Sequence, residues 1–139
     1  MDTHEFITRL LVAIGAGFAI GFERQWHHKP AGLRTNILVA TGAALFVLLS
    51  IQLTVDKGDV TRIIGQVVTG IGFIGAGIIF KEGIKVHGLT TAATIWCSAA
   101  IGSIAAAGYF IEVAIGVVII IFINSLLIPL DKLLAKRKK

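Results

Sequence analysis

Long apolar stretches bounded by charged residues dominate the chain. A bilayer core about 30 Å thick needs roughly 20 helical residues at about 1.5 Å each. Five stretches approach that length and predict membrane spans over residues 6–22, 37–55, 63–80, 89–108 and 113–130. Barrel strands would alternate polar and apolar residues, whereas Val113–Ile123 has no polar side chain. The pattern therefore predicts an all-α, polytopic transmembrane bundle of five helices.

The last two predicted spans belong to one apolar stretch, residues 89–130, whose only charged side chain is Glu112. As a single helix this stretch would be about 63 Å long, twice the thickness of the membrane core. The chain must therefore fold back within it. We expect the turn at Gly108–Glu112.

The distribution of Lys and Arg predicts the orientation, because these residues are retained on the cytoplasmic side. With five spans, ten of the 13 fall on one side, namely Arg24, Lys29, Arg34, Lys81, Lys85, Lys132 and residues 136–139. The other side receives only Arg9, Lys57 and Arg62. We therefore expect the N-terminus outside and the C-terminus in the cytoplasm.

Composition agrees with a membrane protein. Hydrophobic residues make up 55% of the 139 and charged residues only 15%, against about 25% charged residues in ordinary globular proteins. This composition excludes soluble enzymes and nucleic-acid-binding modules, and leaves the lipid bilayer as the surroundings. A basic tail beside a span typically meets anionic lipid rather than nucleic acid. No Pro/Ser-rich linker divides residues 1–139, so a single domain is expected.

Small residues at helical spacing mark candidate packing faces, because helices in lipid associate where their backbones approach closely. The candidate packing or oligomer face comprises Gly17, Gly21, Gly65, Gly70, Gly72, Gly75 and Gly77. Since most of these glycines lie in the third span, we expect that span at the centre of the bundle and the fifth at its lipid-facing edge. The alternative is that the glycines line a permeation path or a hinge.

The run Gly70–Gly75 also matches the dinucleotide fingerprint G-x-G-x-x-G. That motif requires a preceding strand and an acidic residue about 20 positions later. Here it lies inside a transmembrane span among apolar and small residues. We therefore treat the match as accidental and expect no cofactor.

Charged and polar residues gather where the first span ends and the second begins. The candidate cytoplasmic charge cluster comprises Glu23, Arg24, Arg34 and Asn36. Charges this close to the apolar boundary should be paired or solvated, and the shared depth of Glu23 and Arg34 predicts an ion pair between them. The alternative is interfacial anchoring, with Trp26 as an aromatic belt residue.

Hydroxyl groups and a thiol open the fourth span. Its candidate polar face comprises Thr90, Thr91, Thr94, Cys97 and Ser98. Thr90 is expected to be the N-cap, and the other hydroxyls can bond the i−4 carbonyl or a neighbouring helix. The alternative is a polar groove. Cys97 is the only cysteine, so no intrachain disulfide forms, and it is expected to be a small buried residue.

Neither a metal site nor a catalytic site is expected. Asp56, Asp59 and Glu112 fall on the outer side and suit a hydrated Mg²⁺, but Lys57 and Arg62 lie beside them, which favours a solvated loop. No carboxylate lies deep in a span, as proton relays and many ion carriers require. No span pairs a nucleophile with a base, which argues against a membrane enzyme.

Four segments in order resemble the MgtC/SapB family of bacterial inner-membrane proteins. They are residues 21–26 (GFERQW), 31–36 (AGLRTN), 70–77 and 88–98. The resemblance implies a multi-pass membrane domain of five helices, a role in adaptation to low magnesium and, in pathogens, survival inside macrophages. It also implies action through other membrane proteins, such as the F-type ATP synthase or a magnesium-transporting P-type ATPase. Longer members carry a soluble cytoplasmic domain after the last span, so a short or truncated form is expected.

Two functions remain open. The first is a non-enzymatic membrane regulator that docks to other membrane proteins through small-residue helix faces, as a homo-oligomer with a dimer favoured. The second is a transporter or channel for Mg²⁺ or another small ion, which would use the threonine-rich face of the fourth span with the central glycines.

Overall fold

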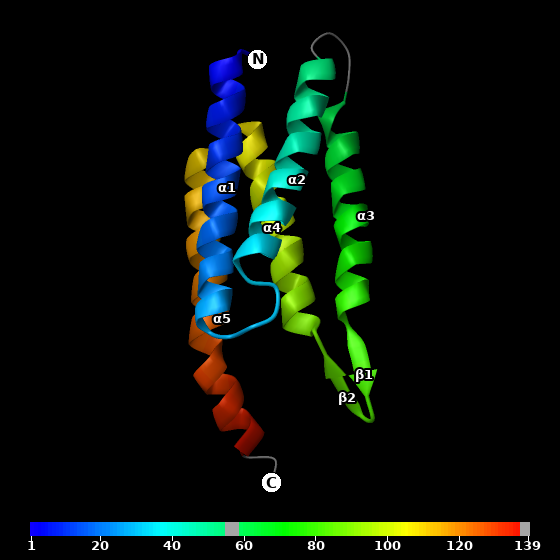
Figure 1. The fold of residues 1–139 in the computed structure, drawn as a ribbon, viewed down its shortest axis with the longest axis vertical. Helices are drawn as coiled ribbons and strands as arrows, with labels where there is room; N and C mark the ends of the chain where they lie inside the picture. Colours follow the sequence, from blue (N-terminus) through cyan, green and yellow to red (C-terminus); the bar gives the residue numbers. More distant parts are fainter. Residues whose placement is uncertain (55–58, 137–139) are drawn as a thin grey trace.

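A computed structural model describes residues 1–54 and 59–136, with side chains through residue 127. Over these residues, five helices are long and apolar enough to cross a membrane. They are α1 (Thr3–Trp26), α2 (Leu33–Leu53), α3 (Val60–Ile78), α4 (Leu89–Ala107) and α5 (Phe110–Lys136). The helices run side by side in alternating directions, so the two termini lie at opposite ends of the bundle (Figure 1). The predicted five-helix transmembrane fold is confirmed.

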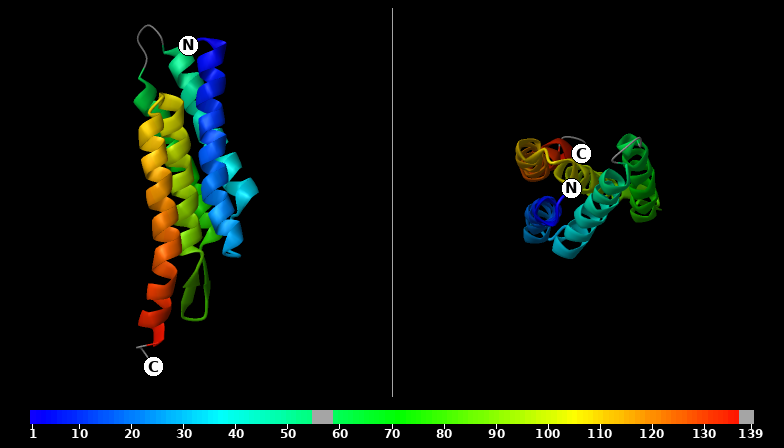
Figure 2. Two further views of the ribbon diagram at one scale, coloured as in Figure 1. Left: turned by 90° about the vertical axis from the view of Figure 1, so that its left-hand side faces the viewer. Right: turned by 90° about the horizontal axis from the view of Figure 1, so that it is seen from above.

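A short β-hairpin between α3 and α4 is the one departure from an all-α chain among the described residues. Strands β1 (Phe80–Glu82) and β2 (Lys85–His87) pair antiparallel. Gly83 opens the two-residue turn with a φ of +60°, which glycine adopts without steric cost. The hairpin, the α1–α2 loop and the C-terminal end of α5 share one end of the molecule, which we call the hairpin end (Figures 1 and 2).

The central helix is α4, which contacts each of the other four helices, whereas α3 packs mainly on α4 and less on α2. Seen from above, α3 lies at the edge of the bundle (Figure 2). The expectation that the third span is central is therefore wrong. Ala, Gly, Ser and Thr make up 13 of the 19 residues of α4 and surround its axis, so several neighbours can approach it. In α3 only Ile71 and Gly75 are buried.

Glycines permit the closest helix contacts. A methyl group at Gly102 of α4 would lie 2.1 Å from the carbonyl oxygen of Ala40, and one at Gly17 of α1 would lie 2.7 Å from that of Asn36. Gly21 makes an equally close contact with the backbone of α2. At these points only glycine fits, so the α1–α2 and α2–α4 contacts are backbone-to-backbone.

The α4–α5 turn is closed by Gly108, which has a φ of +89°, and lies inside the expected segment. Arg9 of α1 holds this turn, because its Nη1 donates to the Ala106 carbonyl at 2.6 Å while its Nη2 pairs with Glu5. Beyond the turn, only 6% of the residues in Phe110–Leu127 of α5 are buried, which agrees with a lipid-facing helix.

Candidate functional site

Arg24 lies in the last turn of α1 at the hairpin end, and its charged side chain is buried. It is only 2% exposed. Its Nη2 donates to the Thr91 hydroxyl of α4 at 2.7 Å and to the Pro30 carbonyl at 3.0 Å. A buried charge is costly unless hydrogen-bonded, so these bonds tie α1 and the following loop to the start of α4.

Glu23 does not pair with Arg34, so that prediction is wrong. Glu23 accepts a hydrogen bond from the Ser125 hydroxyl of α5 at 3.1 Å and lies 3.2 Å from Nδ1 of His27. Arg34 is exposed, whereas Asn36 is fully buried. Successive helical residues are about 100° apart, so a helix that turns Asn36 inward turns Arg34 outward.

Asn36 joins the α1–α2 loop to α4. Its Nδ2 donates to the carbonyls of Ala31 and Gly32 at 2.6 and 2.9 Å, and its Oδ1 accepts from Ser98 at 2.7 Å. Ala31 has a φ of +57°, a left-handed conformation that alanine seldom adopts. The Asn36 amide therefore supports a strained loop and fixes the α2–α4 contact at once.

Three of the five residues expected on the polar face of α4 are turned into the bundle. Thr91, Thr94 and Ser98 are 0–6% exposed, and Cys97 is half-buried. The Thr94 hydroxyl donates to the Thr90 carbonyl at 2.8 Å. Because Thr91, Thr94 and Ser98 all take part in hydrogen bonds within the chain, they form a packed polar seam.

The start of α4 differs from expectation, because Gly88 rather than Thr90 is the N-cap, and Thr90 lies exposed within the first turn. Gly88 has a φ of +86°, and a methyl group there would lie 2.3 Å from the carbonyl oxygen of Ile78. Only glycine can therefore carry the chain from the hairpin into the helix at this point. No side chain caps the first turn.

Two polar residues of α5, Asn124 and Ser125, belong to this site and were missed from the sequence. Asn124 Oδ1 lies 3.4 Å from the Thr94 hydroxyl, and Ser125 bonds Glu23. Their signal was an adjacent polar pair inside an otherwise apolar span. Such residues need partners in lipid, and here the partners are on α1 and α4.

Some of the residues of this site border a cavity of about 930 Å³ at the hairpin end. Its walls come from the end of α1, the following loop, the hairpin, the first turns of α4, and α5. The polar lining residues are Arg24, Lys29, His87, Thr90, Thr91 and Asn124. No Asp or Glu occurs among the described residues that line it. The polar part of the lining therefore presents hydrogen-bond donors and positive charge, and the rest of the wall is apolar.

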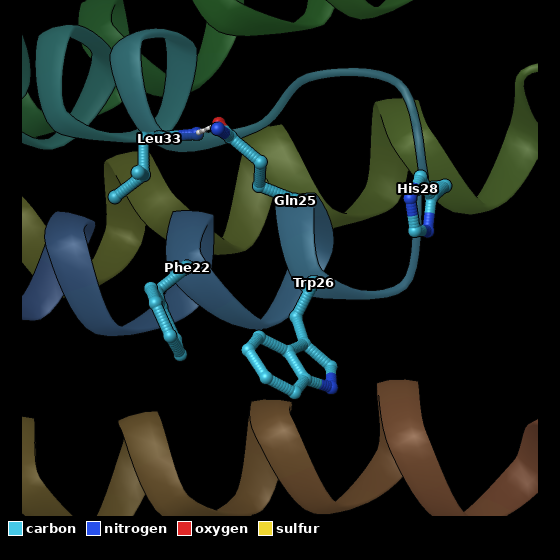
Figure 3. A pocket seen from close by; sticks show the side chains of 5 residues that line it. All are labelled: Phe22, Gln25, Trp26, His28 and Leu33. Atoms are coloured by element: carbon cyan, nitrogen blue, oxygen red, sulfur yellow. Dashed lines mark hydrogen bonds between the residues drawn. The ribbon is translucent and has the colours of Figure 1, made fainter.

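A second, smaller pocket of about 360 Å³ lies on the α1–α2 loop, and Figure 3 shows the five residues that line it. They are Phe22, Gln25, Trp26, His28 and Leu33. Gln25 Oε1 accepts a hydrogen bond from the Leu33 backbone N–H at 3.3 Å, and so satisfies one of the free donors at the start of α2. Trp26 is 71% exposed, as interfacial aromatic residues are.

The glycines of α3 do not pack within the chain, with one exception. Over residues 1–54 and 59–136, no atom outside the backbone of α3 itself lies within 4 Å of a methyl group placed at Gly65, Gly70, Gly72 or Gly77. A methyl group at Gly75 would lie 3.6 Å from the Ala92 side chain of α4. Phe73 on the same helix is 84% exposed. Most of α3 therefore faces outward, beside a groove of about 650 Å³ shared with α2.

The described residues contain no group of three His, Cys, Asp or Glu side chains placed to hold a metal ion. The exposed carboxylate of Asp59 instead caps α3 by accepting from the backbone N–H of Thr61 at 2.9 Å. Asp56 and Lys57 lie outside the described residues.

Comparison with known proteins identifies the family, because the MgtC family profile matches residues 10–133. The chain belongs to the MgtC family. Protein MgtC of Brucella abortus is 56% identical over 118 residues, which are 85% of this chain and 49% of that protein. Protein MgtC of Salmonella typhimurium is 51% identical over 122 residues, which are 88% of this chain and 52% of that protein.

An uncharacterized protein of Synechocystis sp. is 50% identical over 131 residues, which are 94% of this chain and 56% of that protein. The MgtC family chain thus spans about half the length of the curated relatives it matches. No solved structure matches it. Family membership and five apolar helices together make it a multi-pass membrane protein.

Proposed function

We propose that this MgtC family chain is a non-enzymatic regulator in the bacterial inner membrane that acts by docking to other membrane proteins through α3. The observation that carries the proposal is the outward-facing surface of α3, with four glycines against which none of the described residues packs. In lipid, such a face gains stabilising contacts when a second helix approaches it.

The first partner we propose is a second copy of the chain, which would form a dimer through α3. The family resemblance adds the F-type ATP synthase and a magnesium-transporting P-type ATPase as further partners. It also supplies the setting, adaptation to low magnesium and, in pathogens, survival inside host cells. The hairpin end would be cytoplasmic because it carries most of the Lys and Arg residues.

Cysteine crosslinking in native membranes tests the docking surface. In a Cys97→Ser background, Gly72→Cys on α3 should give a crosslinked species larger than the monomer. The control is Val118→Cys on α5, which is 67% exposed but belongs to no glycine face. Capture of nothing beyond the monomer at Gly72, or equal capture at both positions, contradicts docking through α3.

A bulky side chain placed on the same face of α3 gives a second test. Gly72→Leu should abolish copurification of differently tagged copies. It should leave the thermal stability of the monomer in detergent unchanged, because no neighbouring helix that the structure describes comes within 4 Å of a methyl group at that position. Unaltered copurification of the Leu variant would rule out this face as the contact between copies.

The second candidate function is a conductor of Mg²⁺ or another small ion. The observation in its favour is the row of buried hydroxyls on α4 that begins at the cavity. Those hydroxyls take part in hydrogen bonds within the chain, so we expect purified protein in liposomes to pass neither Mg²⁺ nor protons above the rate of empty liposomes. A flux that Thr91→Val or Thr94→Val abolishes would establish conduction and defeat the regulator proposal.

A further inference from the structure

The guanidinium of Arg24 is the centre of an unexplained group of donors in the cavity at the hairpin end. Arg24 is 2% exposed and lines the cavity. Among the described residues, only its Nη2 forms hydrogen bonds, to Thr91 and Pro30, and its Nε is buried without a partner there. A buried donor of a charged group is costly to leave unsatisfied, so this position favours an acceptor.

The first turn of α4 adds backbone donors to the same cavity. The N–H of Ala92 bonds the Gly88 carbonyl, so the three N–H groups before it have no acceptor within the helix. Gly88 supplies no side-chain cap. Residues 88–91 all line the cavity, and a helix N-terminus carries partial positive charge that attracts anions.

Two further groups complete the set of donors. Asn124 of α5 lines the cavity, and its Nδ2 is buried without a partner in the part of the chain that the structure describes. Lys29 lies on the exposed rim. The carboxylate of Glu23 is not among the lining residues, since it turns to Ser125 and His27. Donors from α1, its loop, α4 and α5 therefore converge on one space.

We propose that this cavity binds a phosphate group, carried either by the headgroup of an anionic lipid or by free inorganic phosphate. A tetrahedral oxyanion offers several acceptors to one guanidinium, the helix N-terminus and an amide. At about 930 Å³ the cavity has room for more than the phosphate alone. Its remaining wall is apolar, with Ile78, Phe80, Val86, Ile123 and Leu127, which also suits the neighbouring part of a lipid.

Binding of radiolabelled inorganic phosphate to the full chain in detergent, at constant ionic strength, tests one source. Arg24→Gln should weaken this binding about tenfold or more, because a charged donor is lost. The matched control is Arg34→Gln, an exposed arginine at the same end that does not line the cavity. It should change the affinity less than about twofold.

A second pair of variants separates binding from folding, because Arg24→Gln removes buried hydrogen bonds. Ala93 is exposed and lines the cavity, so Ala93→Phe should block it without touching the core. Ala100→Phe, two turns along α4 and also exposed, is the control. Binding that Ala93→Phe abolishes and Ala100→Phe preserves supports the proposal.

Lipid retention in nanodiscs tests the other source of the phosphate group, the headgroup of an anionic lipid. Wild type taken from discs of phosphatidylcholine with added phosphatidylglycerol should retain phosphatidylglycerol in native mass spectrometry, and Ala93→Phe should not. Retained lipid without phosphate binding assigns the cavity to a headgroup, and the reverse assigns it to free phosphate. The proposal is overturned if wild type binds neither phosphate nor phosphatidylglycerol. It is also overturned if Ala93→Phe and Arg24→Gln bind both probes as well as wild type does.

Discussion

Replacement of Gly102 by alanine should separate α2 from α4 and destabilise the bundle more than any other single methyl group. The added methyl would lie 2.1 Å from the Ala40 carbonyl oxygen. That oxygen is part of the helix backbone and cannot rotate away as a flexible side chain would. Ordinary contact begins near 3.4 Å, so the two helices must move apart by about 1.3 Å.

The displacement has a second consequence one turn away. Ser98 and Asn36 lie four residues before Gly102 and Ala40, on the same faces, and their hydrogen bond is 2.7 Å long. A separation of about 1.3 Å would break that bond. Overpacking costs about 1–3 kcal/mol and a buried interhelical hydrogen bond contributes about 1 kcal/mol, so we expect a loss of about 2–4 kcal/mol in the free energy of unfolding.

The matched control is Gly15→Ala on α1, where no atom lies within 4 Å of the added methyl. There the higher helix propensity of alanine should leave stability unchanged or raise it by up to about 1 kcal/mol. Reversible unfolding in mixed detergent micelles, followed by circular dichroism, gives both values. If the two variants agree within about 0.5 kcal/mol, the inference that backbone contact forces glycine at 102 is refuted.

Three further predictions follow from particular hydrogen bonds. Arg9→Gln should lower the free energy of unfolding by about 1–2 kcal/mol in the same micelle assay, because the Ala106 carbonyl loses a charged donor. Asn36→Leu should lower it by about 2 kcal/mol or more, because the buried Ser98 hydroxyl and the half-buried Ala31 carbonyl each lose their hydrogen bond to the Asn36 side chain, and a variant as stable as wild type would contradict this. Hydrogen bonds from the hydroxyl and N–H of Thr61 lower the pKa of Asp59. The carboxylate therefore stabilises the start of α3 at neutral pH and loses this effect as the pH falls through the lowered pKa. Amide exchange at Thr61 should accordingly be faster in Asp59→Ala than in wild type at neutral pH, and the two rates should converge in acid.

The polar residues of α4 show which features of the site the sequence pattern could predict. Thr91, Thr94 and Ser98 could be placed on one face because the helical period fixes which positions coincide. The partners of Thr91 and Ser98 could not, because they lie on other helices, 67 and 62 residues away along the chain, whereas Thr94 bonds the Thr90 carbonyl four residues before it, as the helical spacing allows. The same limit applies to Asn124, whose role depends entirely on the approach of α5 to α4.

The predicted ion pair between Glu23 and Arg34 failed for a rotational reason. Glu23 lies near the end of α1 and Arg34 near the start of α2, at the same depth. That shared depth suggested an ion pair between them. Depth fixes position along a helix axis but not direction around it. The inward position of Asn36 turns Arg34 to the exposed side of α2, and the Asn36 amide, not the arginine, connects the loop to the bundle.

The sequence by itself determined that five helices cross the membrane and where the chain turns between them, because lipid requires about 20 apolar residues per crossing and satisfied backbone groups throughout. Only the tertiary structure decided that α4 is central, that α3 is peripheral and that donors converge on the cavity at the hairpin end. Hydropathy does not separate the central helix from the peripheral one, because α3 and α4 have nearly the same mean hydropathy, 1.3 and 1.4. Their order around the axis depends on which backbones can touch, and that is set by short-range contacts such as those of Gly17 and Gly102, which exist only once the helices are assembled.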